Sequence, residues 1–124
     1  MRDAALRGCR VLVVEDNFLL AMEIEGVLRR HGGVVLGPVG SIERALALLD
    51  DEAPPDIAVL DVDLQGCWVT PVAAALGTRG VPYVLVTGYA DLQLREPELH
   101  GRRRLDKPVS DDDLLRALLE VLRG

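Results

Sequence analysis

Short apolar runs alternate along this chain with longer segments in which apolar residues recur every three or four positions. An unbroken apolar run predicts a buried strand, and the longer spacing predicts an amphipathic helix. Strands are expected at residues 10–14, 34–39, 57–60, 81–86 and 102–106. Helices are expected at about 18–31, from 42 until a break at 53–55, from 71 to about 76, and from 111 towards the end of the chain.

Residues with strong local preferences mark the ends of several predicted helices. Gly32 and Gly33 stop the first helix, and Pro71 suits the first turn of the third. Ser41 and Ser110 stand where a side chain caps the second helix and the last. The stripe of the last helix that is expected to be buried consists of Leu114, Leu115, Leu118, Val121 and Leu122.

The order of these elements predicts an α/β fold in one domain over residues 1–124. Alternating strands and helices build a parallel sheet with helices on both faces. We expect a doubly wound, five-stranded sheet of flavodoxin-like order 2-1-3-4-5, with the strands numbered along the chain. Pro38 has no amide donor, so the second strand should lie at an edge. Residues 64–68 are expected to form a loop, and 90–100 is the weakest part of the pattern.

Composition and charge exclude several classes of protein. The chain is 49% hydrophobic, which is typical of a globular domain, and its net charge of −6 argues against nucleic-acid binding. No apolar run is long enough for a membrane span or for a signal peptide. Cys9 and Cys67 fit neither a disulfide framework nor a metal-binding spacing. We therefore expect a cytoplasmic protein with reduced thiols and no membrane partner.

Polar residues follow four of the five predicted strands. Glu15 and Asp16 follow the first strand, Asp61 the third, Thr87 the fourth and Lys107 the fifth. Each has a plainer role when taken alone, as a helix cap, a strand residue or a solvated charge. Because the carboxyl ends of parallel strands share one edge of a sheet, however, all five side chains are expected to meet in one crevice.

The chemistry of this group of residues points to phosphoryl transfer. Carboxylates in one crevice raise one another's pKa unless a cation joins them. Mg²⁺ suits the site, since it prefers oxygen ligands and often binds through one or two carboxylates together with phosphate. A carboxylate can act as a nucleophile and form an aspartyl phosphate. The transfer then needs mainly positioning and charge stabilisation, which a lysine and a threonine can supply.

Four ordered motifs resemble the receiver domain of two-component response regulators, and the resemblance spans the whole chain. The motifs are Val-Val-Glu-Asp at 13–16, Val-Leu-Asp at 59–61, Val-Thr-Gly at 86–88 and Asp-Lys-Pro at 106–108. The resemblance implies that Asp61 accepts a phosphoryl group from a histidine kinase. Thr87 and Lys107 would then bind the phosphoryl oxygens. Such a domain catalyses only its own phosphorylation and dephosphorylation.

The resemblance also implies which residues hold Mg²⁺. Asp61 and Asp16 would be direct ligands, and Glu15 would act through a water molecule. The backbone carbonyl of Asp63 would add a further ligand. In this family the proline after the lysine, here Pro108, often follows a cis peptide bond, which would direct the lysine inward.

Two features depart from the common receiver pattern. The family usually has Tyr or Phe three residues before the lysine as a rotameric switch, and here that position is Arg104. An aromatic residue instead follows the threonine, in Pro-Tyr-Val-Leu-Val-Thr-Gly-Tyr at 82–89, which resembles the FAT GUY subgroup of single-domain regulators. Tyr89 is therefore the predicted switch. If the chain is complete, no output domain follows Gly124, and the expected output is binding of a downstream protein or phosphotransfer to another partner.

Two other functions fit parts of the pattern. The Asp-Val-Asp sequence at 61–63 resembles the motif that begins haloacid-dehalogenase-like phosphatases, although there the motif lies near the N-terminus and the acidic pair comes late. A pseudo-receiver would be a scaffold that is never phosphorylated, and the complete acidic set argues against it. Trp68 would either shield the phosphate or pack on its loop. Residues 102–104 are either a solvated basic run or a docking patch for an acidic partner.

Overall fold

The computed structural model describes residues 4–88, 98–99 and 102–124. The strands are β1 (Arg10–Val14), β2 (Val34–Val39), β3 (Ile57–Asp61), β4 (Asp63–Leu64), β5 (Cys67–Trp68), β6 (Tyr83–Thr87) and β7 (Arg104–Asp106). The helices are α1 (Phe18–Arg30), α2 (Ile42–Asp51), α3 (Thr70–Thr78) and α4 (Asp111–Leu122). In the described part of the chain, no helix has both the length and the apolar character that a membrane crossing requires.

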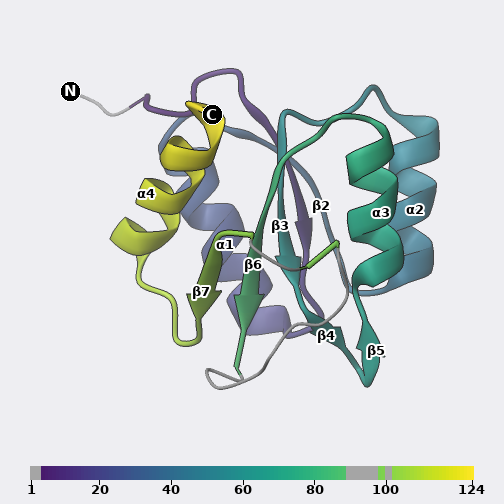
Figure 1. Cartoon of the computed structure of the whole chain (residues 1–124). Helices are drawn as coiled ribbons and strands as arrows, with labels where there is room; N and C mark the ends of the chain where they lie inside the picture. Colours follow the sequence, from purple (N-terminus) through teal and green to yellow (C-terminus); the bar gives the residue numbers. More distant parts are fainter. Residues whose placement is uncertain (1–3, 89–97, 100–101) are drawn as a thin grey trace.

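The main sheet is parallel and has five strands in the order β2-β1-β3-β6-β7 (Figure 1). With the short strands β4 and β5 set aside, this is the predicted order 2-1-3-4-5, so the predicted fold class is confirmed. The strand that contains Pro38 lies at an edge, as expected. Ser41 and Ser110 cap α2 and α4, where their side chains accept backbone amides at 3.2 and 3.1 Å.

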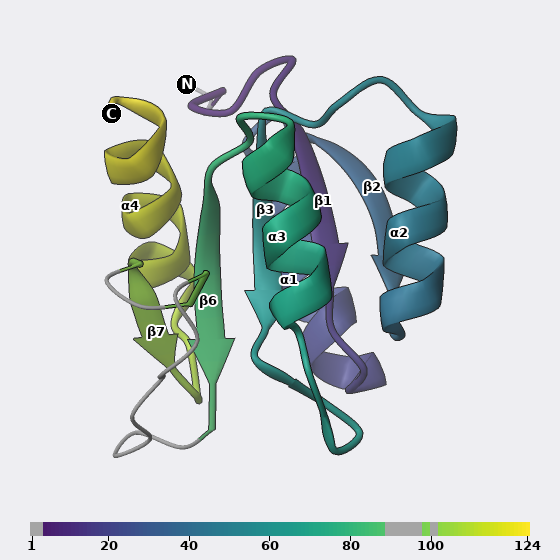
Figure 2. The same cartoon turned by 45° about the vertical axis from the view of Figure 1, so that its right-hand side comes forward.

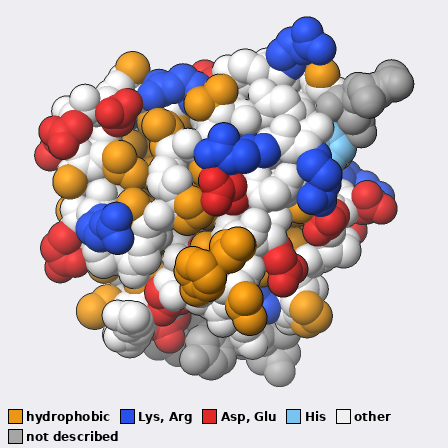
Figure 3. Space-filling model, turned by 180° about the vertical axis from the view of Figure 1, so that it is seen from behind, with side chains coloured by type: hydrophobic (Ala, Val, Ile, Leu, Met, Phe, Trp, Pro, Cys, Tyr) orange, Lys and Arg blue, Asp and Glu red, His pale blue; other side chains and the backbone are white. Residues whose placement is uncertain are grey.

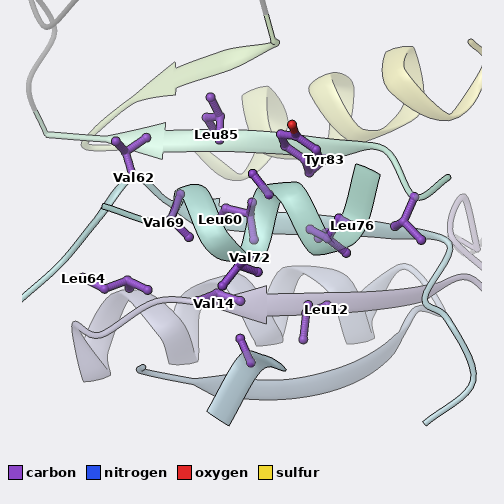
Figure 4. Packing of buried hydrophobic residues seen from close by; sticks show 14 of the residues in the cluster. Leu12, Val14, Leu60, Val62, Leu64, Val69, Val72, Leu76, Tyr83 and Leu85 are labelled. Carbon is purple, nitrogen blue, oxygen red and sulfur yellow. The ribbon is translucent and has the colours of Figure 1, made fainter. Parts of the chain in front are cut away.

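Side chains alternate between the two faces of the sheet, and two helices cover each face (Figure 2). The face towards α1 and α4 carries a row of valines from β1, β3 and β6, namely Val11, Val13, Val59, Val84 and Val86. The face towards α2 and α3 carries Leu12, Val14, Leu60, Tyr83 and Leu85, which pack against α3 residues such as Val72 and Leu76 (Figure 4).

The central strands β3 and β6 are buried along their whole length. Each buried Val, Leu or Ile side chain contributes about 1.5–3 kcal/mol relative to an exposed one. These strands are therefore among the best-anchored parts of the fold. Their last residues, Asp61 and Thr87, are held at one edge of the sheet by this packing.

The segment that was expected to be a loop forms a small hairpin instead. Asp63 and Leu64 in β4 pair in antiparallel fashion with Trp68 and Cys67 in β5. The two residues between these strands, at 65 and 66, have φ angles of 55° and 87°. Positive φ at both central residues is characteristic of the tightest hairpin turns. The prediction failed because strands of two residues are too short to show any periodicity.

Three other elements differ by two residues from the predicted bounds. Strand β6 begins at Tyr83 instead of residue 81. Helix α3 begins at Thr70 and continues to Thr78, beyond the expected end near 76. Strand β7 begins at Arg104 instead of residue 102. The guanidinium of Arg102 lies 5.0 Å from the centroid of the Tyr83 ring, and its Nε donates to the carbonyl of Glu98 at 3.4 Å. These contacts hold Arg102 outside the ladder that pairs β6 with β7.

Candidate functional site

The C-terminal ends of β1, β3, β6 and β7 lie along one edge of the sheet, at the lower edge of Figure 1. The predicted site residues end these strands or directly follow them, namely Glu15, Asp16, Asp61, Thr87 and Lys107. Hydrogen bonds, ion pairs and shared pocket walls link several of these side chains directly. The structure therefore brings together residues that are up to 92 positions apart in the sequence.

The ammonium group of Lys107 joins two acidic side chains that come from different strands. Its Nζ lies 3.3 Å from Asp61 Oδ2 and 3.3 Å from Glu15 Oε2. Asp61 and Glu15 are each only 4% exposed, so their charges are largely removed from water. A cation at this distance compensates much of the cost of burying them. Lys107 is therefore part of the acidic site, and the plainer role as a solvated charge does not describe it.

Helix α1 is capped by Asn17 and not by the acidic pair before it. Asn17 Oδ1 accepts a hydrogen bond from the amide of Leu20 at 3.0 Å. The amide of Asn17 itself donates to Glu15 Oε2 at 3.0 Å. Glu15 Oε1 is buried and has no hydrogen-bond partner among the described residues. Glu15 and Asp16 are therefore available for a role other than helix capping.

The electrostatics of the site leave Asp61 short of compensating positive charge. Its pKa is raised from 3.8 to about 7, first by burial and then by the charge and hydrogen bond of Glu15, while Lys107 opposes the rise. Burial also disfavours the charged form of Lys107, but the nearby carboxylates of Asp61 and Glu15 outweigh it and raise the pKa of the ammonium. Lys107 is thus charged at neutral pH, whereas further positive charge is needed to ionise Asp61 fully.

The acidic cluster has the donors that a hard divalent cation requires. Glu15, Asp16 and Asp61 each offer a carboxylate oxygen, and these oxygens lie within 4.8 Å of one another. Ligands on neighbouring corners of an octahedral Mg²⁺ ion lie about 3 Å apart and opposite ones about 4 Å, because each is about 2.1 Å from the metal. The buried, unpaired Oε1 of Glu15 and the raised pKa of Asp61 both indicate a site that a cation would stabilise. The residues present therefore fit Mg²⁺.

An open pocket of about 430 Å³ gives access to this cluster. Its walls are formed by Asp16, Asp61, Asp63, Gln65, Gly88 and Lys107. Oδ1 of Asp63 accepts the amide of Gly66 at 2.8 Å, so the side chain of Asp63 stabilises the hairpin turn. Its predicted contribution to metal binding, through the backbone carbonyl, stays a prediction.

Sequence reasoning missed Gln65 and Gly88 as walls of the pocket. The available signal for Gln65 was its position directly before Gly66, since glycine is the usual second residue of a two-residue hairpin turn, although the first is usually Asn, Asp or Gly. Gly88 follows directly on Thr87, and a Cβ atom at its position would lie 3.9 Å from Lys107 Cδ, at ordinary van der Waals distance.

The remaining predicted residues are placed as follows. Thr87 is 1% exposed, and its carbonyl accepts the amide of Lys107 at 2.8 Å, next to a Lys107–Pro108 bond that is cis as predicted. Tyr89, the predicted switch, lies outside the described residues. Arg104 is half-buried, with its Nε 3.7 Å from Asp106 Oδ1. Trp68 is 41% exposed on the hairpin, opposite Asp63, so the choice between its two predicted roles stays open.

Comparison with known proteins places this geometry in a family. Residues 11–119 match the family model described as "Response regulator receiver domain". The chain is 29% identical over 112 residues to the transcriptional regulatory protein PdtaR of Mycobacterium tuberculosis, covering 88% of this chain and 54% of that protein. It is 32% identical over 117 residues to the positive alginate biosynthesis regulatory protein of Pseudomonas aeruginosa, covering 91% and 47%. The chain thus spans about half the length of these curated relatives.

Solved structures agree with this assignment. The solution structure of SdrG from Sphingomonas melonis Fr1 is similar with a TM-score of 0.80 and 36% identity, covering 94% of this chain and 98% of that one. A CheY-like receiver domain protein from Methanospirillum hungatei JF-1 has a TM-score of 0.81 and 28% identity, covering 94% of each chain. The match to the family model spans most of the chain, and the sheet order and the acidic strand ends agree with it. This chain therefore belongs to the response regulator receiver domain family.

Proposed function

We propose that this receiver domain accepts a phosphoryl group on Asp61 from a histidine kinase, in a reaction that depends on Mg²⁺. The observation that carries the proposal is the position of Lys107 Nζ, 3.3 Å from both Asp61 and Glu15. An ammonium held against the nucleophile is placed to neutralise the oxygens of an arriving phosphoryl group. The open pocket over Asp61 and its unusual pKa support the same role.

Asp61 supplies the nucleophile. One of its carboxylate oxygens attacks the phosphorus of a phosphohistidine, the bond from phosphorus to the imidazole nitrogen breaks, and the imidazole takes up a proton. Lys107 donates to one phosphoryl oxygen, and the hydroxyl of Thr87 donates to another. Thr87 ends β6, which pairs with the strand of Asp61, and Lys107 follows β7, the next strand along the sheet, so both donors are carried on the same side of Asp61.

The metal site belongs to the same constellation. Asp61, Asp16 and the backbone carbonyl of Asp63 would ligate Mg²⁺, with Glu15 acting through a water molecule. Bound Mg²⁺ supplies positive charge to Asp61 and to the phosphoryl oxygens. Asp16 lines the open pocket together with Asp61, whereas Glu15 is buried and already accepts from Asn17 and Lys107. This difference supports the direct role for Asp16 and the indirect one for Glu15.

An apolar surface beside the site supports a protein as the phosphoryl donor. Phe18, Leu19 and Met22 at the start of α1 are 73%, 70% and 53% exposed. Phe18 and Met22 line a groove of about 260 Å³, and Asp16 lines both this groove and the pocket over Asp61. Figure 3 shows the molecule from the side on which α1 lies, where apolar side chains gather between charged ones. Such a patch favours contact with a partner protein.

The phosphorylated domain would signal either by binding a downstream protein or by transferring its phosphoryl group to another partner. A phosphoryl group adds negative charge and acceptor oxygens at Asp61. Thr87 would move to donate to one of these oxygens, and the neighbouring Gly88 has no side chain to obstruct the change in the backbone. Tyr89, two residues after Thr87, would then move with this segment and report phosphorylation at the surface. In this proposal Arg104 does not act as the switch; its guanidinium lies beside Asp106, with Nε 3.7 Å from Oδ1.

The proposal is tested by phosphorylating the protein with acetyl phosphate and Mg²⁺ and measuring its intact mass. We expect a gain of one phosphoryl group, no gain in EDTA, and no gain in Asp61→Asn. Asp112→Asn, which changes an exposed carboxylate in the first turn of α4, is the matched control and should label normally. Equal labelling of Asp61→Asn would refute Asp61 as the acceptor. Absence of labelling in the unsubstituted protein with Mg²⁺ present would favour a scaffold that is never phosphorylated.

A further inference from the structure

Among the residues that the structure describes, Gln65 is the one non-glycine residue whose φ angle is positive. It also lines the pocket over Asp61. Its φ is 55°, at the first central position of the turn between β4 and β5. Glycine, asparagine and aspartate are the residues preferred at that position, because they tolerate the left-handed conformation. Residues held in such disfavoured conformations cluster at active sites and ligand-binding sites. The location of Gln65 in the phosphoacceptor pocket therefore points to a role in that pocket.

The hairpin holds Gln65 firmly in relation to Asp61. Oδ1 of Asp61 accepts the amide of Asp63 at 3.3 Å, and Oδ1 of Asp63 accepts the amide of Gly66 at 2.8 Å. At the base of the hairpin, the amide of Val69 donates to the carbonyl of Val62 at 2.9 Å. Leu64 adds a buried anchor, since it is 3% exposed. Gln65 thus stands on a short turn that is hydrogen-bonded to the phosphoacceptor itself.

Gln65 also differs chemically from the other walls of the pocket. Of the described residues that line it, three are carboxylates, one is an ammonium and one is a glycine without a side chain. Gln65 alone carries a neutral group that both donates and accepts hydrogen bonds. An amide of this kind can accept a hydrogen bond from a water molecule while it donates to a phosphoryl oxygen. A glutamine that orients an attacking water is a recurrent device in phosphoryl transfer to water.

We propose that the side-chain amide of Gln65 binds and orients the water molecule that hydrolyses the phosphoryl group on Asp61. The inference rests on the proposed phosphorylation of Asp61. In the step, the water oxygen forms a bond to phosphorus and the bond from phosphorus to the Asp61 oxygen breaks. The Asp61 carboxylate is restored, and inorganic phosphate leaves as dihydrogen phosphate, carrying both hydrogens of the water. Gln65 thereby sets the lifetime of the phosphorylated protein.

The test measures how fast the phosphoryl group is lost after acetyl phosphate is removed, by following intact mass with Mg²⁺ present. Gln65→Ala and Gln65→Gly should each slow the loss by about tenfold, because one well-placed hydrogen bond in a transition state is worth about that factor. Gln65→Asn keeps a shorter amide and suits the turn, so its rate should lie between these variants and the original. Cys67→Ala, an exposed position in the same hairpin that does not line the pocket, is the control and should decay normally.

Thermal unfolding separates this role from a structural one. Glycine relieves the disfavoured φ, so Gln65→Gly should melt at the same temperature or higher while it loses phosphate more slowly. A labelled protein whose decay is unchanged in both Gln65→Ala and Gln65→Gly would overturn the inference and leave the proposed function standing. Equal slowing in Cys67→Ala would also overturn it, by assigning the effect to the hairpin as a whole. Failure to label the unsubstituted protein would instead refute the proposed function and this inference with it.

Discussion

Replacing Asp61 by asparagine should stabilise the metal-free protein above neutral pH, although it removes the predicted phosphoacceptor. Asparagine has nearly the shape of a protonated aspartate but carries no charge. Folding raises the pKa of Asp61 from 3.8 to about 7, first through burial and then through Glu15. The charged carboxylate therefore destabilises the fold by about 1.4 kcal/mol for each pKa unit, or about 4 kcal/mol over about three units. Because water in the adjoining pocket screens part of this cost, we expect a net gain of about 2 kcal/mol.

The dependence on pH follows from the direction of this shift. A carboxyl with a raised pKa contributes stability that is fully present below 3.8 and is lost as the pH rises through about 7. The difference between Asp61→Asn and the original protein should therefore be largest at about pH 8 and should shrink as the pH falls. For a chain of 124 residues, about 2 kcal/mol corresponds to a rise of about 8 °C in Tm.

Thermal unfolding followed by circular dichroism, in EDTA, measures this difference. Asp112→Asn removes an exposed carboxylate and should change Tm little at either pH. Added Mg²⁺ should raise the Tm of the original protein more than that of Asp61→Asn, because the asparagine lacks the ligand charge. If Asp61→Asn melts at or below the original protein at about pH 8 in EDTA, the charged Asp61 is not destabilising and the electrostatic account of the site is wrong.

Three further predictions concern the metal, the donor and the switch. Asp16→Ala should weaken Mg²⁺ binding, measured by calorimetry, at least about tenfold more than Glu15→Ala, since only Asp16 is a proposed direct ligand; equal affinities would contradict this order. Phe18→Ala should slow labelling by a phosphorylated histidine kinase about tenfold while labelling by acetyl phosphate is unchanged, and equal effects on both donors would argue against a docking role for α1. Tyr89→Ala should keep labelling intact but reduce the gain in partner affinity on phosphorylation; if that gain persists there and vanishes in Arg104→Ala, the switch lies on β7.

The fold was predictable because its periodic patterns are strong and its order of elements is simple. The alternation of buried strands and amphipathic helices led to the correct sheet order, and Pro38 indicated the edge strand. The last turn of α4 was less predictable. Leu122 fits the apolar stripe of that helix, yet it is 37% exposed because it ends the helix directly before the Arg123 cap. The spacing of apolar residues alone does not show at which residue a helix stops packing against the sheet.

Which residues meet at the site could be predicted only because they end or directly follow particular strands. Topology brings the ends of β1, β3, β6 and β7 to one edge, so the residues that meet there follow from their sequence positions. Topology does not show that Glu15 is buried while Asp16 faces the pocket, or that Asn17 caps α1. These depend on side-chain packing after the sheet has formed. Gln65 was missed for a similar reason, because its place in the pocket depends on a hairpin with strands of two residues.

The most direct test of the central claim is to locate the phosphoryl group on the chain. The protein is phosphorylated with acetyl phosphate and Mg²⁺ and then reduced with borohydride, which converts an aspartyl phosphate into homoserine. Tandem mass spectrometry of the peptides then identifies the modified residue. We predict homoserine at position 61 and aspartate at its neighbours Asp16 and Asp63. Homoserine at either neighbour, with an unmodified Asp61, would contradict the account of this site.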